Sequence, residues 1–172
     1  YECPLPFKRL LPVRTVRWLA QTGRFTFYKD TSHSLPTMTE RLNVIGDTHM
    51  RLYNAAIASL VASMQVGAAG LSGYAANVYP DLVSWVCRHA NDADQTDVLR
   101  VQRVLTMVEH SINLRYPTSA KFLLDASSRL RWRARSRWKP ESIGDHEGEP
   151  LRQIAQLVQE LDLGRADLYA SR

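Results

Sequence analysis

The sequence has few of the features that mark secreted, membrane-spanning or metal-binding proteins. Its two cysteines, Cys3 and Cys87, are too few for a disulfide framework or a cysteine-based metal site. No apolar run reaches the roughly 20 residues of a membrane-spanning helix, and no charged-then-apolar leader is visible. The spacing of cysteine, histidine and carboxylate residues indicates no metal site. We therefore expect a reduced, cytoplasmic protein with no metal and no membrane partner.

Glycine is also sparse, with eight residues in 172. The stretch richest in glycine, GAAGLSG at 67–73, lacks the G-x-G-x-x-G spacing of a dinucleotide-binding loop, so a Rossmann domain is disfavoured. The net charge of +5 is modest, but the cations cluster late in the chain. Composition therefore leaves one ordinary soluble domain as the expectation.

The first half of the chain alternates strand-like with helix-like runs. The strand-like runs are FTFYK at 25–29, MRLYNA at 50–55 and AAGLSG at 68–73. Apolar residues at helical spacing precede the first run and follow each of them, which predicts a parallel sheet with crossover helices. After residue 92 only helical patterns are evident. They centre on 98–112, 119–128 and 151–161.

Four segments of the chain carry a family resemblance. They are YECP at 1–4, FYKDTS at 27–32, LYNAA at 52–56 and GAAGLSGYAANVYP at 67–80. Their order and spacing resemble the class I aldolase family of dihydrodipicolinate synthase and N-acetylneuraminate lyase. The resemblance implies an α/β fold, the C-terminal part of a (β/α)8 TIM barrel with strands five to eight, followed by a three-helix extension. It places the barrel part at 1–91 and the extension at 92–172.

The resemblance also implies the roles of individual residues. Lys29 matches the lysine that closes strand six and forms the Schiff base, and Tyr1 matches the tyrosine that transfers protons. Three further residues match substrate-binding positions by place alone: Asn54, Ser72 and Gly73. Imine chemistry of this kind requires no cofactor. The implied substrate is a pyruvate-like 2-keto acid.

The residues around Lys29 fit that role without the family. Side chains at period two share a strand face, so Phe25, Phe27 and Lys29 are expected to point the same way. Aromatic walls would favour the neutral amine that attacks a carbonyl. Simpler interpretations remain open: a lysine at a strand end is commonly solvated, Tyr1 can be a packing residue, and Asn54 can end a strand.

The sequence departs from the family at several positions. The arginine expected in the dihydrodipicolinate synthase branch falls on Pro6, which argues against that synthase activity. Glu2 replaces the usual asparagine after the tyrosine, and Cys3 is expected to be a small buried filler. The family's first four and a half strands, with their Gly-Thr-Thr carboxylate loop, do not match any part of the chain. We therefore expect an aldolase or dehydratase of sugar-acid type. We also expect this chain by itself to be inactive or poorly folded unless another chain or a further segment supplies that half of the barrel.

A basic run, RLRWRARSRWK at Arg129–Lys139, lies outside this pattern. It interleaves cations with two tryptophans and has no acidic residue. A nucleic-acid-binding module is one alternative function, and a non-catalytic family descendant is another. We favour a contact within a homo-oligomer, a dimer or tetramer, and do not expect nucleic acid as a partner. The acidic segment ESIGDHEGE at 141–149 is expected to form a loop that could pair with the run.

Overall fold

The computed structural model describes residues 1–3, 9–127, 131–138 and 142–161. The strands are β1 (Phe27–Asp30), β2 (Arg51–Asn54) and β3 (Gly70–Leu71). The elements of the first half are completed by α1 (Val13–Gln21), α2 (Leu35–Ile45), η1 (Ile57–Ser59), α3 (Leu60–Gln65), η2 (Tyr74–Asn77) and α4 (Pro80–His89). The rest of the described chain holds α5 (Thr96–Asn113), α6 (Thr118–Ser127) and α7 (Asp145–Gln159).

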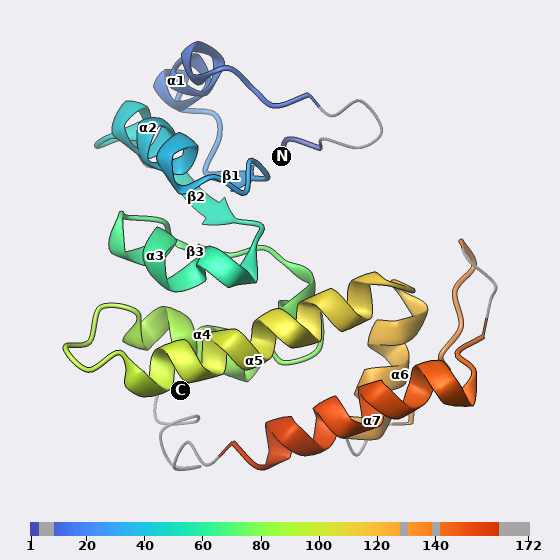
Figure 1. The fold of residues 1–172 in the computed structure, drawn as a ribbon. Helices are drawn as coiled ribbons and strands as arrows, with labels where there is room; N and C mark the ends of the chain where they lie inside the picture. Colours follow the sequence, from blue (N-terminus) through green and yellow to red (C-terminus); the bar gives the residue numbers. More distant parts are fainter. Residues whose placement is uncertain (4–8, 128–130, 139–141, 162–172) are drawn as a thin grey trace.

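The predicted alternation of strands and helices is confirmed. The three strands form a parallel sheet in the order β1-β2-β3, and helical segments follow each strand (Figure 1). Local signals set the bounds of α2, because the Ser34 hydroxyl caps its start and Gly46, with φ of 49°, follows its end. In the sheet, Lys29 pairs with Tyr53, which in turn pairs with Gly70.

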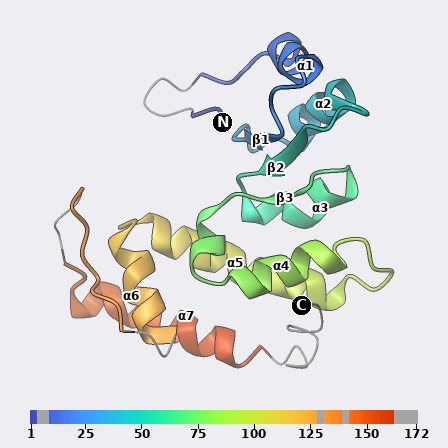
Figure 2. The ribbon, with the colours of Figure 1, turned by 180° about the vertical axis from the view of Figure 1, so that it is seen from behind.

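Helices cover one face of the sheet and leave the other open. Tyr28 and Leu52 point into the apolar cluster that α1 and α2 build against the sheet. Phe27 and Lys29 alternate with these buried residues and therefore lie on the opposite face. Since helices form the outer ring of a TIM barrel, the open face corresponds to a barrel interior. The described strands form an open sheet rather than a closed ring (Figure 2).

Helix α5 links the sheet-containing half to the last two helices. Its predicted apolar stripe is buried: Val98, Val101, Leu105, Val108 and Ile112. The first three of these pack with α3 and α4, and the last two pack with α6 and α7. The apolar clusters thus continue across residue 92, and the division of the chain at that residue stays a prediction.

Residues 1–3 lie in no strand. They are held by side-chain contacts instead, because the Thr31 hydroxyl donates to the Glu2 carbonyl and the Thr31 amide donates to the Glu2 carboxylate. Within the described ranges, none of the helices combines the length and the apolar character needed to cross a bilayer.

Candidate active site

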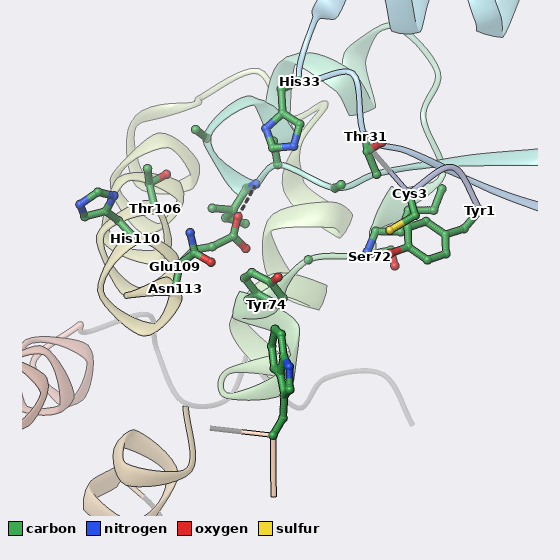
Figure 3. Close-up of a pocket in the computed structure, with 17 residues that line it drawn as sticks. Tyr1, Cys3, Thr31, His33, Ser72, Tyr74, Thr106, Glu109, His110 and Asn113 are labelled. Carbon is green, nitrogen blue, oxygen red and sulfur yellow. Dashed lines mark hydrogen bonds between the residues drawn. The ribbon is translucent and has the colours of Figure 1, made fainter. Parts of the chain in front are cut away.

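A cavity of about 610 Å³ lies where the three strands end. Its walls come from residues 1–3, from the loops after β1, β2 and β3, and from one side of α5 (Figure 3). The carboxyl ends of parallel strands are where barrel proteins assemble their sites. This cavity is therefore the candidate active site.

Lys29 and Tyr1, the two predicted catalytic residues, meet in this cavity. The Lys29 ammonium nitrogen lies 4.8 Å from the centroid of the Tyr1 ring. A hydrogen bond with the Cys3 thiol raises the pKa of the Tyr1 hydroxyl above its ordinary value, so the hydroxyl keeps its proton at neutral pH. Cys3 is exposed on the cavity wall, so the expectation of a buried filler was wrong.

A buried ion cluster fixes the two segments that carry these residues. Glu2 follows Tyr1, Asp30 follows Lys29, and both carboxylates bind the guanidinium of Arg41. The Arg41 side chain is 1% exposed and donates to the two Glu2 carboxylate oxygens over 2.8 and 3.1 Å. It also donates to Asp30 and to the Leu11 carbonyl oxygen. One side chain from α2 thus holds the N-terminal segment against the end of β1.

Glu2 is ionised in this cluster despite its burial. Burial opposes the charged form, but hydrogen bonds from the Leu11 and Thr31 amides and the nearby Arg41 charge outweigh it. Together they hold the pKa of Glu2 below its usual range. Sequence reasoning noticed Glu2 only as a departure from the family, and its partner lies 39 residues away on another element.

The predicted substrate-binding residues separate into two groups. Ser72 and Gly73 line the cavity, on the loop after β3. Asn54 is buried beneath it, where its amide donates to the hydroxyls of Ser59 and Ser63 and its carbonyl accepts from the Ala56 amide. These bonds give Asn54 a structural part in shaping the loop after β2, and contact with substrate stays a prediction.

Sequence reasoning missed the wall supplied by α5. Four side chains of α5 line the cavity, although no site residue was predicted on this helix from the sequence (Figure 3): Thr106, Glu109, His110 and Asn113. Burial raises the pKa of Glu109, although backbone hydrogen bonds from the loops after β2 and β3 partly offset this. One signal in the sequence could have found it: Glu109 follows Leu105 by four residues, which places a carboxylate at the edge of an apolar stripe.

The aromatic enclosure expected around Lys29 is incomplete. Phe25 is 43% exposed and Phe27 is 69% exposed, because no described segment covers the open face of the sheet. The Phe27 ring contacts the Tyr53 ring, with centroids 5.8 Å apart. Lys29 itself is half-buried, so the described residues shield the amine only in part.

The described part of the basic run, residues 131–138, lies beside α6. Lys121 donates to the Arg135 carbonyl oxygen, and Trp138 reaches the cavity wall. Arg129 and Lys139 lie outside the described residues. Homo-oligomer contact and nucleic-acid binding therefore both stay predictions for this run.

The acidic segment that follows the run does not form the expected loop. From residue 145 it is the first turn of α7, where Glu147 pairs with Arg115 over 2.7 Å and Glu149 pairs with Arg152 over 2.9 Å. Their partners thus come from the α5–α6 connection and from α7 itself rather than from the basic run.

Among the described residues, no group of three histidine, cysteine or carboxylate side chains is placed so that it could hold a metal ion.

The parallel sheet, the covering helices and the cavity at the strand ends define an α/β protein similar to part of a TIM barrel. The sequence profile of the Dihydrodipicolinate synthetase family matches residues 1–130. The chain therefore belongs to this family, as its motifs predicted. Among curated protein sequences, comparison finds no match.

Several solved structures share the fold. Dihydrodipicolinate synthase from Bacillus anthracis is 20% identical with a TM-score of 0.75, over 86% of this chain and 50% of that one. A prophage protein of the family from E. coli K12, solved with pyruvate, is 17% identical with a TM-score of 0.77, over 95% and 55%. A variant of 2-keto-3-deoxygluconate aldolase from Sulfolobus solfataricus is 14% identical with a TM-score of 0.71, over 90% and 52%. The chain thus spans about half the length of these structures.

Proposed function

We propose that the protein containing this chain is a Schiff-base-forming lyase or aldolase that acts on a pyruvate-like 2-keto acid. The observation that carries the proposal is the position of Lys29, at the end of a parallel strand with the Tyr1 ring 4.8 Å away in a shared cavity. Membership of the Dihydrodipicolinate synthetase family supports a lyase-type activity. The prophage relative was solved with pyruvate, which supports the substrate class.

The proposed reaction begins when the neutral Lys29 amine adds to the ketone carbon of the substrate. The carbinolamine then loses water, and the resulting imine withdraws electrons from the neighbouring carbon, C3. Carbon–carbon cleavage, condensation or dehydration can follow from the carbanion at C3. The Tyr1 hydroxyl, which lies beside Lys29 and is protonated at neutral pH, donates a proton to the substrate, and the phenolate that this leaves accepts a proton from the substrate in a later step.

Ser72 and Gly73 are assigned to the wall of the substrate pocket, since both line the cavity that holds Lys29 and Tyr1. Gly73 leaves room there: a Cβ atom at this position would lie 3.0 Å from the Ala55 carbonyl oxygen. Its φ of −124° can be adopted by any residue, so glycine is required here by the lack of space for a side chain and not by the backbone conformation.

Reduction with borohydride tests the proposal on the full-length protein. With pyruvate present, we expect a stable adduct that peptide mass mapping locates on Lys29. The Lys29→Arg variant should lose the adduct, whereas Lys121→Arg, a matched change on α6, should keep it. An adduct on another lysine, or none with pyruvate or other short 2-keto acids, would contradict the proposed activity.

A further inference from the structure

We propose that Glu109 makes the α5 end of the cavity a subsite for an uncharged, hydroxyl-bearing end of the substrate, and that it excludes a phosphate or a second carboxylate there. The inference rests on the proposed function, because it concerns the part of a 2-keto acid that lies beyond the Lys29 imine. It would make Glu109 a residue that determines specificity.

The first observation is that the Glu109 carboxylate holds the backbone amides of two strand-end loops. One carboxylate oxygen accepts from the Ala75 amide over 3.1 Å. The other accepts from the Ile57 amide over 3.5 Å. Ile57 and Ala75 lie in the loops after β2 and β3. In many barrel enzymes, backbone amides of the loops after the last strands bind a substrate phosphate. Here the Glu109 carboxylate already accepts hydrogen bonds from the Ile57 and Ala75 amides, so these amides are not available to a phosphate.

The second observation is that the chain leaves space for this carboxylate. A Cβ atom at Gly73 would lie 2.9 Å from Glu109 Oε2, closer than such atoms approach in folded proteins. The same glycine lines the cavity that contains Lys29. The Glu109 carboxylate therefore packs against Gly73 in the cavity wall, and Glu109 itself lines the cavity.

The third observation is the balance of charge. Among the described residues, Lys29 is the one lysine or arginine that lines this cavity, and the imine reaction uses it. A phosphate at the α5 end would lie beside Glu109 with no described lysine or arginine near it, and like charges at close range repel each other. In the sequence, Pro6 also stands where the dihydrodipicolinate synthase branch is expected to have an arginine.

The surrounding side chains suit hydroxyl groups. Carboxylate oxygens accept hydrogen bonds from hydroxyls, and the Asn113 amide on the same side of the helix offers both a donor and an acceptor. The Thr106 hydroxyl donates to the Gln102 carbonyl oxygen, and its own oxygen can accept a further hydrogen bond. His33 and His110 flank Glu109 in the cavity and add ring nitrogens that can donate or accept (Figure 3). A chain of hydroxyl-bearing carbons therefore finds partners at this end, whereas a second anion meets repulsion.

A matched pair of 2-keto acids tests the inference on the full-length protein. The probes are 2-keto-3-deoxygluconate and its 6-phosphate, which differ by one phosphate group. The measured quantity is the concentration of each that gives half-maximal borohydride-trapped adduct on Lys29. In the unaltered protein, we expect this concentration to be at least about tenfold higher for the phosphate ester, because its phosphate is repelled by Glu109.

The Glu109→Gln variant should narrow that ratio to about two- to threefold, chiefly through better trapping of the phosphate ester, because the amide removes the charge and keeps the shape. Glu109→Asp keeps the charge and should keep the ratio between the two keto acids. A ratio that changes in Glu109→Gln but not in Glu109→Asp is then due to the charge and not to a loss of stability. Glu40→Gln, an exposed change on α2, should leave the ratio unaltered.

Two results would overturn the inference while pyruvate still labels Lys29. One is equal trapping of both keto acids by the unaltered protein, and the other is an unchanged ratio in a folded Glu109→Gln variant. Absence of any pyruvate adduct on Lys29 would instead overturn the proposed function, so the two failures are distinguishable.

Discussion

Replacement of Arg41 by methionine tests the ion cluster that anchors the site. The change removes four hydrogen bonds of the guanidinium: two to Glu2, one to Asp30 and one to Leu11. It leaves two carboxylates buried without a cation. Loss of one partner from a buried ion pair costs about 3–5 kcal/mol, and we expect the free energy of unfolding to fall by that amount. Arg41→Lys keeps a charge without the planar fork, and we expect it to lose about 1.5–3 kcal/mol.

Urea unfolding of the full-length protein measures these losses, with Arg14→Met on the exposed side of α1 as the control. The rate of pyruvate trapping at Lys29 should also fall, since Tyr1 and Lys29 lose their common anchor. In a Glu2→Gln, Asp30→Asn background, the same Arg41 change should cost much less, because no buried charge is left unpaired. A loss below about 1 kcal/mol, or an equal loss in the neutral background, would refute the assigned role of the cluster.

Two further predictions concern stability. Because the pKa of Glu2 is held below its usual range, its ionised form stabilises the fold fully above about pH 4.3. This contribution is lost as the pH falls through the lowered pKa. Urea unfolding between pH 7 and pH 3 should show that loss, and a Glu2→Gln variant that falls just as steeply would contradict it. Leu105→Ala removes a fully buried side chain of α5 and should cost about 2–5 kcal/mol. Leu114→Ala, at a position 72% exposed, should change thermal stability little, and equal effects of the two would show that α5 is not packed as described.

Local signals were enough to predict where most elements lie. The start of α2 follows from a serine cap and a proline in its first turn, and its end follows from Gly46. The long apolar stripe from Val98 to Ile112 predicted α5, because the helical spacing of apolar residues can be recognised without knowing what the helix packs against. Both signals act within a few residues of chain, which is why they can be read without the fold.

The partners of buried charges could not be predicted in the same way. Glu109 accepts a hydrogen bond from Ile57, 52 residues away in sequence, and only the packing of α5 against the strand-end loops brings the two together. Arg41 was not singled out from the sequence, yet it is among the largest fully buried side chains. A charge at the edge of an apolar stripe indicates burial, but the sequence does not say which loop it will meet.

In two segments of the site, a residue that lines the cavity is followed directly by a carboxylate that binds Arg41. On β1, Lys29 faces the cavity side and Asp30 faces the helices, because successive side chains of a strand point to opposite faces. In the N-terminal segment, Tyr1 lines the cavity while Glu2 is buried against Arg41. Each reactive side chain is therefore adjacent to an anchored carboxylate, and one guanidinium holds both. A shift of β1 by one residue would exchange Lys29 with Asp30, so the ion pair to Arg41 also fixes the register that keeps the amine in the cavity.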